Sequence, residues 1–284
     1  MPIKFENVSY VYSKGTPMEK QALSCVDLEI LEGEFLALVG RTGCGKSTLV
    51  QHLNALLNPT QGTVYIDSFV NSADKKKRDK KTHPLRKNVG LVFQFPEYQL
   101  FEETVVKDVA FGPKNFGDDK ETALAKAREA LLRVGLDESF FERSPFELSG
   151  GEKRRVAIAG VLAMNPKYLV VDEPTAGLDP AGAKEMMDLF RNVHQSGTTV
   201  ILVTHDMDLV LAYCSDVIVL DHGKVVKTCK PVDLFGDDVT QYSLQQPMLF
   251  DFAKSLGEKG YSFDAATLRD VSSLAKQIAQ GRKK

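Results

Sequence analysis

A glycine-rich loop carries the most specific chemical signal in this sequence. Residues 40–48 read GRTGCGKST and match the pattern G-x-x-x-x-G-K-[ST] between an apolar strand and a helix. Its glycines let backbone N–H groups close around phosphate oxygens, Lys46 can reach the β- and γ-phosphates, and the Ser47 hydroxyl can ligate Mg²⁺. A chance glycine-rich turn would lack that flanking context. We therefore expect a nucleoside triphosphate to bind the whole loop, which comprises Gly40, Arg41, Thr42, Gly43, Cys44, Gly45, Lys46, Ser47 and Thr48.

Two adjacent carboxylates end a second apolar stretch, YLVVDEP (168–174). Asp172 suits a Mg²⁺ contact, direct or through water, and Glu173 can orient or deprotonate an attacking water. Alone, an Asp-Glu pair at a strand end could equally cap the next helix. With a phosphate loop in the same sheet, we interpret the pair as part of a hydrolytic site.

Two polar side chains stand at the ends of two further apolar strands. Ligands of parallel sheets bind outside the carboxyl ends of the strands, where Gln94 (after GLVF) and His205 (after VILVT) lie. There His205 can contact the γ-phosphate, and the amide of Gln94 can touch Mg²⁺ and the attacking water. Without the other motifs, a structural histidine and an ordinary loop amide would be better interpretations. We expect Glu173, His205, Lys46 and Gln94 to be catalytic, and Ser47, Gln94 and Asp172 to ligate the metal.

The stretch LSGGEKRRVAIAG (148–160) resembles a second phosphate-binding helix start. Ser149 and Glu152 fit a capping box. That box does not explain Gly150 and Gly151, because glycine costs about 0.5–1 kcal/mol relative to alanine inside a helix. Small residues, free N–H groups and a positive helix end suit a phosphate, yet the chain has one lysine-bearing phosphate loop. We predict that Ser149, Gly150 and Gly151 serve a nucleotide held by another chain.

The elements that must position these residues alternate between strands and helices. Continuous apolar strands separated by helices indicate a parallel sheet covered on both faces. Between Glu97 and Pro166 helical periodicity replaces strand signals, which predicts a helical insertion between two strands of one sheet. After about Leu234 the chain turns polar. The expected strands are 3–12, 22–30, 35–39, 62–67, 88–93, 168–174, 198–206 and 216–220, the expected helices are Lys46 to about Leu57, 181–197, 248–260 and 266–284, and a hairpin turns at 221–223.

Composition and charge narrow the class of protein. The chain has 284 residues, of which 43% are hydrophobic and 26% charged, as in globular proteins with a full core. A net charge of -2 provides no global basic field for nucleic acid. The lysine-rich stretch 72–84 has no interleaved aromatic residues, so we interpret it as a solvated loop rather than a nucleic-acid patch.

Cysteines and apolar runs bear on the compartment. The four cysteines lack metal spacing and are expected to be reduced thiols, with Cys44 a loop residue rather than a catalyst. No apolar run reaches the ~18–20 residues that cross a bilayer, and the first residues lack a signal-peptide pattern. We therefore expect a cytoplasmic chain that reaches the membrane through a partner.

Taken together, these motifs resemble the ATP-binding cassette (ABC) ATPases. The ordered set GRTGCGKST, Gln94, LSGGE, YLVVDEP, AGLDP and His205 covers about residues 3–230. The resemblance implies an α/β fold: a P-loop NTPase (RecA-like) core with a mainly parallel sheet, an antiparallel β subdomain, an inserted helical subdomain and a small helical C-terminal extension. It implies an ABC ATPase domain over 1–234, with the helical subdomain at about 97–166, and the extension over 235–284.

In that family two nucleotide-binding domains dimerise head to tail. Each ATP lies between one chain's phosphate loop and the other's LSGG segment, so the resemblance implies ATP and Mg²⁺ as cofactors and a role in trans for the glycine pair. It also implies that Tyr12 stacks on adenine, although a half-buried strand aromatic is an alternative interpretation of Tyr12. Asp179, in GLDP, would cross the interface and couple the two sites.

A narrower match lies in VGLVFQFPEYQLFEETVVKDVAFGP (89–113). This segment is similar to the ATPases of energy-coupling factor (ECF) transporters, in particular to the A-prime type. The resemblance implies a heterodimer with a paralogous ABC ATPase, a transmembrane T component contacted through the Gln94 loop and the helical subdomain, and a substrate-binding S component, with no nucleic acid. The implied task is ATP hydrolysis on the cytoplasmic side of the cell membrane, powering uptake of a vitamin or a transition-metal ion.

Three other functions fit parts of the pattern. The ATPase of another ABC importer class, for an amino acid or a metal, differs only in the 94–113 segment. A non-transport ABC protein acting on DNA or ribosomes would carry a long coiled-coil insertion or two cassettes in one chain. A module that uses ATP only as a switch would not need Glu173 and His205.

Overall fold

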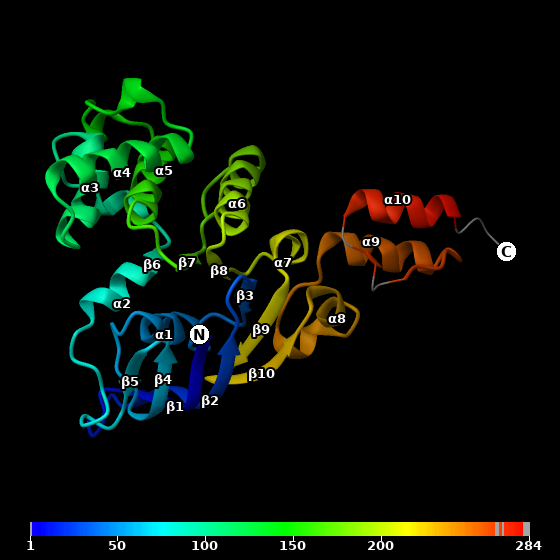
Figure 1. Ribbon diagram of the computed structural model, residues 1–284. Coiled ribbons are helices and arrows are strands. Elements are labelled where there is room, and N and C mark those ends of the chain that lie inside the picture. Colours follow the sequence, from blue (N-terminus) through cyan, green and yellow to red (C-terminus); the bar gives the residue numbers. More distant parts are fainter. Residues whose placement is uncertain (1, 265–266, 269, 281–284) are drawn as a thin grey trace.

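A six-stranded sheet forms the centre of the fold, and the computed structural model describes residues 2–264, 267–268 and 270–280 (Figure 1). The strand order is β10-β9-β3-β8-β7-β6, and every neighbouring pair is parallel except β9 and β10. Both β3 and β8 are buried along their whole length, as their continuous apolar runs predict. The strands are β3 (Phe35–Val39), β6 (Val89–Val92), β7 (Tyr168–Asp172), β8 (Thr199–Val203), β9 (Asp216–Asp221) and β10 (Lys224–Cys229).

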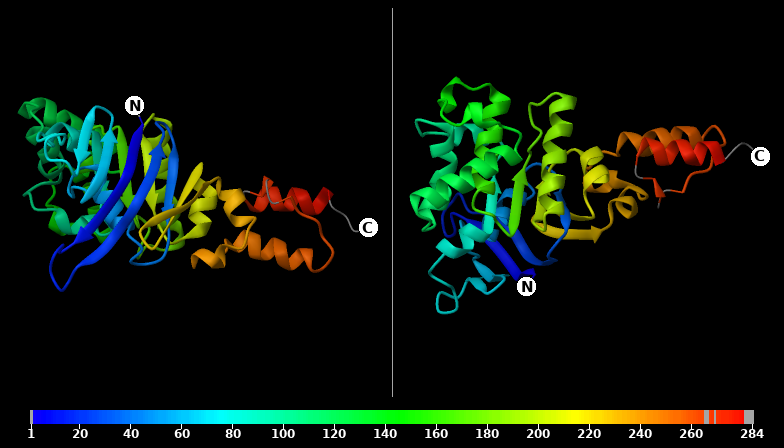
Figure 2. Two further views of the ribbon diagram at one scale, coloured as in Figure 1. Left: turned by 90° about the horizontal axis from the view of Figure 1, so that it is seen from below. Right: turned by 45° about the horizontal axis from the view of Figure 1, so that its top comes forward.

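An antiparallel sheet of order β2-β1-β4-β5 packs beside this centre (Figure 2, left). It consists of β1 (Ile3–Tyr12), β2 (Lys20–Ile30), β4 (Gln61–Ile66) and β5 (Phe69–Ser72). One apolar cluster joins it to α1 (Lys46–Leu53) and to the face of β3 that carries Leu36 and Leu38. The alternate residues Phe35, Ala37 and Val39 belong to a second cluster under the helices, so both faces of the central sheet are covered.

A helical segment is inserted between β6 and β7. Among the described residues between these two strands there is no strand, in agreement with the sequence pattern. The segment contains η1 (Pro96–Gln99), α3 (Val105–Asn115), α4 (Lys120–Arg133), η2 (Glu138–Phe140), η3 (Pro145–Glu147) and α5 (Gly150–Leu162). The Arg155 guanidinium, on α5, donates hydrogen bonds to Val134 O at 2.7 Å and to Glu185 Oε2 at 2.8 Å. The second bond ties the inserted helices to α6 (Pro180–Gln195).

The C-terminal helices lie at the opposite end of the molecule from α3, α4 and α5 (Figures 1 and 2). They follow α7 (Met207–Tyr213) and comprise α8 (Pro231–Phe235), η4 (Val239–Tyr242), α9 (Met248–Gly257) and α10 (Val271–Gln280). The boundary expected between residues 234 and 235 falls inside α8. Of the helix expected over 266–284, residues 266, 269 and 281–284 lie outside the described residues. No described helix is both long and apolar enough to cross a membrane.

Several elements differ from the expected pattern. The helix after the phosphate loop ends at Leu53 rather than near Leu57, because Asn54 leaves helical geometry and Ala55 takes a positive φ of 52°. Within the polar stretch 72–84, β5 ends at Ser72 and α2 (His83–Asn88) begins at His83. These short elements and α7 carry too few apolar positions to produce a periodic signal.

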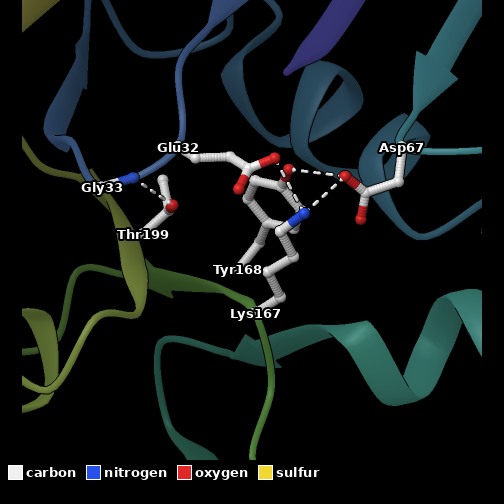
Figure 3. A network of polar contacts seen from close by, with 6 residues as sticks. All are labelled: Glu32, Gly33, Asp67, Lys167, Tyr168 and Thr199. Carbon is white, nitrogen blue, oxygen red and sulfur yellow. Dashed lines mark hydrogen bonds and ion pairs between the residues drawn. The ribbon is translucent and has the colours of Figure 1, made fainter. Parts of the chain in front are cut away.

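A polar network joins the two sheets at the N-terminal ends of the parallel strands (Figure 3). Lys167 Nζ donates to Glu32 Oε1 at 2.8 Å and to Asp67 Oδ1 at 2.7 Å, and Tyr168 Oη donates to Asp67 Oδ1 at 3.1 Å. Glu32 precedes β3, Asp67 follows β4, and Lys167 precedes β7. Burial opposes the charge of Lys167, but its two carboxylate partners raise the pKa of the ammonium group above its usual value. The network therefore holds three chain segments together as a charged cluster.

Candidate nucleotide-binding site

A cavity of about 520 Å³ opens at the carboxyl ends of the parallel strands. The strand order explains its walls, because β6, β7, β8 and β3 are neighbours and the residues that follow them meet at one edge. The antiparallel sheet closes the remaining side through β1 and β2. The lining residues are Tyr12, Lys20, Ala22, Thr42, Gly43, Gly45, Lys46, Ser47, Thr48, Gln94, Asp172, Glu173 and His205.

The phosphate loop needs glycine at two positions for steric reasons. Gly40 has a φ of +147°, and a Cβ there would lie 2.1 Å from the backbone oxygen of Leu220. Gly45 has a φ of +114°, and a Cβ there would lie 2.5 Å from the backbone oxygen of Ala22. Backbone atoms of the central sheet and of β2 therefore lie in close contact with the loop. Helix α1 then begins at Lys46 without a side-chain cap, so its first N–H groups are available to an anion.

Three of the nine loop residues support the cavity without lining it, namely Gly40, Arg41 and Cys44. Lys46 Nζ donates to Gly40 O at 2.6 Å and to Arg41 O at 3.0 Å, so these carbonyls hold the lysine across the loop. Cys44 is buried behind the loop, and burial raises the pKa of its thiol. A protonated, enclosed thiol is a packing residue, in agreement with the interpretation that it is not a catalyst.

Glu173 and His205 form a pair at the cavity edge. Their Oε1 and Nδ1 atoms are 2.8 Å apart. The Glu173 side chain is 16% exposed and the His205 side chain 82%, so the carboxylate is enclosed and the imidazole faces the opening. Glu173 has a φ of +48°, a left-handed conformation that costs a non-glycine residue on the order of 1 kcal/mol and that recurs at functional sites. Its N–H donates to Val203 O at 2.9 Å, which ties this backbone to β8.

Oxygen donors for a divalent cation line the same cavity. Burial raises the pKa of Asp172, as does the neighbouring charge of Glu173, while Lys46 lowers it. The Ser47 hydroxyl, the Gln94 amide and the Asp172 carboxylate also face this space. Mg²⁺ binds proteins through one or two carboxylates together with substrate phosphates, so this donor set fits it. In the described ranges no cluster of three or more His, Cys, Asp or Glu residues could hold a metal by itself.

One end of the cavity lies between β1 and β2. Tyr12 is 38% exposed, and its Oη is 3.1 Å from Thr48 Oγ1. Sequence reasoning missed Lys20 and Ala22, which line the cavity from β2. The signal that could have found Lys20 is the pairing register of β1 and β2, because Lys20 stands directly opposite Tyr12 in this antiparallel pair. The sequence of the seven-residue connection between the two strands does not specify that register.

A buried arginine, also missed from sequence, links the site to the inserted helices. Arg154, on α5, is 4% exposed and donates to Gln94 O at 2.9 Å and to Ala176 O at 2.8 Å. Burial lowers the pKa of its guanidinium and the nearby Glu97 carboxylate raises it. The segment after β6, helix α5 and the loop after Glu173 are therefore held by one side chain.

The LSGG segment lies outside this cavity. Ser149 caps α5, its N–H donates to Glu152 Oε2 at 2.8 Å, and its Oγ accepts from Glu152 N at 3.4 Å, which confirms the expected capping box. The glycine pair is exposed, and beyond the adjacent backbone of α5 a Cβ at either position would meet no atom of the described residues within 4 Å. No described residue accepts a hydrogen bond from the N–H of Gly150 or Gly151. Asp179 caps α6, accepting from Gly182 N at 2.7 Å, and is also exposed.

Comparison with known proteins identifies the class. Residues 23–176 match the family model for ABC transporters. The energy-coupling factor transporter ATP-binding protein EcfA2 of Streptococcus sanguinis (strain SK36) is 56% identical over 93% of this chain and 94% of the relative. The protein of that name from Lactiplantibacillus plantarum (strain ATCC BAA-793 / NCIMB 8826 / WCFS1) is 52% identical over 99% of this chain and 95% of the relative.

Two solved structures share the architecture. That of cbiO1 from Clostridium perfringens, described as part of the ABC transporter complex cbiONQ, has a TM-score of 0.73 and 37% identity over 89% of this chain and 98% of that one. That of the ATP-binding cassette MJ0796, a dimer in a post-hydrolysis state with ADP and Pi, has a TM-score of 0.69 and 33% identity over 81% of this chain and 98% of that one.

The chain therefore belongs to the ABC transporter family and, within it, to the ATP-binding proteins of energy-coupling factor transporters. It is an ATP-binding transport ATPase that works in association with a membrane. The resemblance drawn from the motifs and the expected fold class are confirmed.

Proposed function

We propose that this chain binds ATP with Mg²⁺ at the strand-end cavity and hydrolyses it to power uptake of a vitamin or a transition-metal ion through membrane partners. The observation that carries the proposal is that Lys46, Glu173 and His205 line one cavity, together with three oxygen donors that suit Mg²⁺. The ABC family of the chain supports the nucleotide, and its ECF relatives support the transport task.

The chain's own residues divide the work of hydrolysis. Loop N–H groups and Lys46 bind the β- and γ-phosphates, so the ammonium group exchanges two backbone carbonyls for phosphate oxygens. Glu173 orients the attacking water and accepts its proton while the bond between the γ-phosphorus and the bridging oxygen breaks, releasing ADP and phosphate. His205 holds the γ-phosphate, and Tyr12 stacks on adenine. When bound by Ser47, Gln94 and Asp172, Mg²⁺ neutralises phosphate charge.

Ser149, Gly150 and Gly151 complete the ATP site of a partner ATPase in this proposal. Open space around the glycine pair supports it, because no described residue approaches closely enough to require glycine there. The capping box uses the N–H groups of Ser149 and Glu152 and leaves those of the two glycines for an external anion. Asp179, at the exposed start of α6, crosses the same interface and couples the two sites.

The transmembrane T component docks beside the Gln94 loop and the helical subdomain. A groove of about 220 Å³ there is lined by Glu97, Tyr98, Leu100, Pro145, Phe146 and Lys153. Tyr98 is 84% exposed and Phe146 63%, and aromatic side chains of this kind anchor protein interfaces. Glu97 Oε2 is buried and has no hydrogen-bond partner among the described residues, and Arg154 of the same chain is a cation near this carboxylate.

The proposed transporter contains further partners besides the T component. The partner ATPase is a paralogue, a separate S component binds the transported substrate, and no nucleic acid takes part. The complex holds this chain peripherally at the cytoplasmic side of the cell membrane. We assign residues 1–234 to the ABC ATPase domain, about 97–166 to its helical subdomain and 235–284 to a helical extension.

The Glu173→Gln variant tests the proposal in the transporter purified with its native membrane partners. The variant should bind ATP as the wild type does, because the amide keeps the shape of the side chain. Turnover and coupled uptake should fall by about 10²–10⁴, the usual contribution of a general base. Lys46→Ala is the comparison variant, in which ATP binding itself should weaken. Normal turnover in Glu173→Gln would refute the hydrolytic assignment.

A further inference from the structure

An aromatic cluster lies deeper in the protein than the end of the cavity between β1 and β2, and the proposed mechanism does not use it. The ring of Tyr10 stands edge-on to that of Tyr12, with centroids 4.8 Å apart and planes at 83°. The same Tyr10 ring stands edge-on to the imidazole of His52, at 5.1 Å and 79°. The Tyr10 ring contacts His52 and the Tyr12 hydroxyl lies 3.1 Å from Thr48 Oγ1, so both tyrosines of β1 point toward α1. The three rings form a series that ends at the cavity.

His52 is an unusual choice for the inner end of this series. It is fully buried on α1, and its Nδ1 lies 2.7 Å from Thr48 O. A carbonyl oxygen only accepts, so Nδ1 carries the proton and Nε2 keeps its lone pair. In the part of the chain that the structure describes, Nε2 has no hydrogen-bond partner. An apolar side chain would avoid the cost of a buried unpartnered nitrogen, so packing alone does not account for a histidine here.

Thr48 connects both ends of the series. Its backbone oxygen binds His52, and its side-chain hydroxyl lies 3.1 Å from Tyr12 Oη. It stands two residues after Lys46 in the first turn of α1. The helix that carries the phosphate-binding lysine thus holds Tyr12 by two routes, one through a hydroxyl and one through the rings of His52 and Tyr10.

We propose that Tyr10 and His52 are positioning residues that hold the Tyr12 ring in its base-binding orientation and so set the contribution of the purine to nucleotide affinity. This inference rests on the proposed stacking of Tyr12 on adenine. A ring that is already fixed loses less freedom when the base binds, which improves affinity without any new contact. Removing one edge-to-face contact should weaken ATP binding about 2- to 12-fold.

Two probes separate positioning from general support of the fold. Calorimetric titration of the full chain with ATP and with inorganic tripolyphosphate, both in the presence of Mg²⁺, gives a Kd for a ligand with the base and for one without it. Tyr10→Leu and His52→Leu should raise the Kd for ATP about 2- to 12-fold and leave that for tripolyphosphate unchanged. Tyr10→Phe keeps the ring edge and should bind ATP as the wild type does. Unchanged tripolyphosphate binding also reports that the phosphate loop is folded.

Tyr12→Ala is the reference variant. It should raise the Kd for ATP alone, and adding Tyr10→Leu to it should cause no further change. If Tyr12→Ala leaves both Kd values unchanged, the stacking role of Tyr12 fails, and the positioning inference fails with it. If Tyr12→Ala weakens ATP binding but Tyr10→Leu and His52→Leu do not, the positioning inference alone is overturned. Equal weakening of both probes by these two variants would also overturn it, because that result describes damage to the phosphate loop.

Discussion

Replacing Gly150 with aspartate should separate the stability of this chain from the activity of the assembled transporter. Gly150 is the first residue of α5, is exposed, and is not among the residues with a positive φ. Apart from the adjacent helix backbone, a Cβ there meets no atom within 4 Å in the part of the chain that the structure describes. The fold of this chain therefore does not require glycine at a position that the proposed trans role reserves for a phosphate.

Two effects stabilise the isolated variant. A carboxylate in the first turn of a helix gains about 0.3–1 kcal/mol from the helix dipole, and aspartate has a helix propensity about 0.3 kcal/mol better than that of glycine. Together they amount to about 1 kcal/mol, which raises Tm by about 2 °C in a chain of this size. Differential scanning calorimetry of the purified chain measures this shift. Gly150→Ala adds no charge but gains about 0.5–1 kcal/mol of helix propensity, so it should give a rise of similar size.

The assembled transporter should respond in the opposite direction. A carboxylate about 5 Å from a phosphate charge, at an effective dielectric constant of about 20, opposes binding by about 3 kcal/mol, or more than a hundredfold. The ATPase activity of a complex carrying Gly150→Asp should fall accordingly, and the damage should map to the nucleotide held by the partner. Destabilisation of the isolated chain by more than about 1 kcal/mol, or full activity of the complex, would refute the reasoning.

Three further substitutions test the site. Gly40→Ala forces a Cβ to 2.1 Å from Leu220 O at a φ of +147° and should lower the unfolding free energy by about 2–4 kcal/mol in calorimetry, an outcome that wild-type stability would contradict. Arg154→Lys cannot hold both Gln94 O and Ala176 O, so denaturant titration should show a loss of about 1–3 kcal/mol, whereas an unchanged midpoint would show the second bond to be dispensable. Asp172→Asn removes a carboxylate whose pKa is raised in the folded state. Without nucleotide at pH 7, the variant should have a higher Tm than the wild type, because it no longer buries that charge. The wild-type chain gains stability as pH falls through the raised pKa of Asp172, so this difference in Tm should shrink in acid. A difference in Tm that stays constant with pH would argue against the raised pKa.

The site residues that the sequence predicts are those that follow the ends of parallel strands. Gln94, Glu173 and His205 each follow an apolar run, and parallel strands bring their carboxyl ends to one edge, so linear motifs were enough to group them. Arg154 was missed because the run EKRR reads as a solvated helix face, and its burial depends on two backbone oxygens distant in the chain. Lys20 was missed because its place depends on hairpin register.

The short elements at the two ends of the polar stretch 72–84 show the same limit. β5 is held from outside its own residues, since Asp79 Oδ2 accepts from Val70 N at 2.8 Å. A four-residue strand has little periodicity of its own, so its existence depends on such contacts and on pairing with β4. Sequence pattern therefore predicts the long elements and misses those that tertiary contacts create.

The order of strands in the central sheet also determines how this protein is made. β3 lies between β8 and β9 in the sheet, but β8 begins at Thr199, about 160 residues after β3 ends at Val39. At about 5–20 residues per second, the ribosome needs on the order of ten seconds to supply the first neighbour. All five residues of β3 are buried in the finished protein, so during that time an apolar strand with two open edges is exposed. The antiparallel sheet can pair early, whereas the strand that leads into the phosphate loop waits for the last third of the chain.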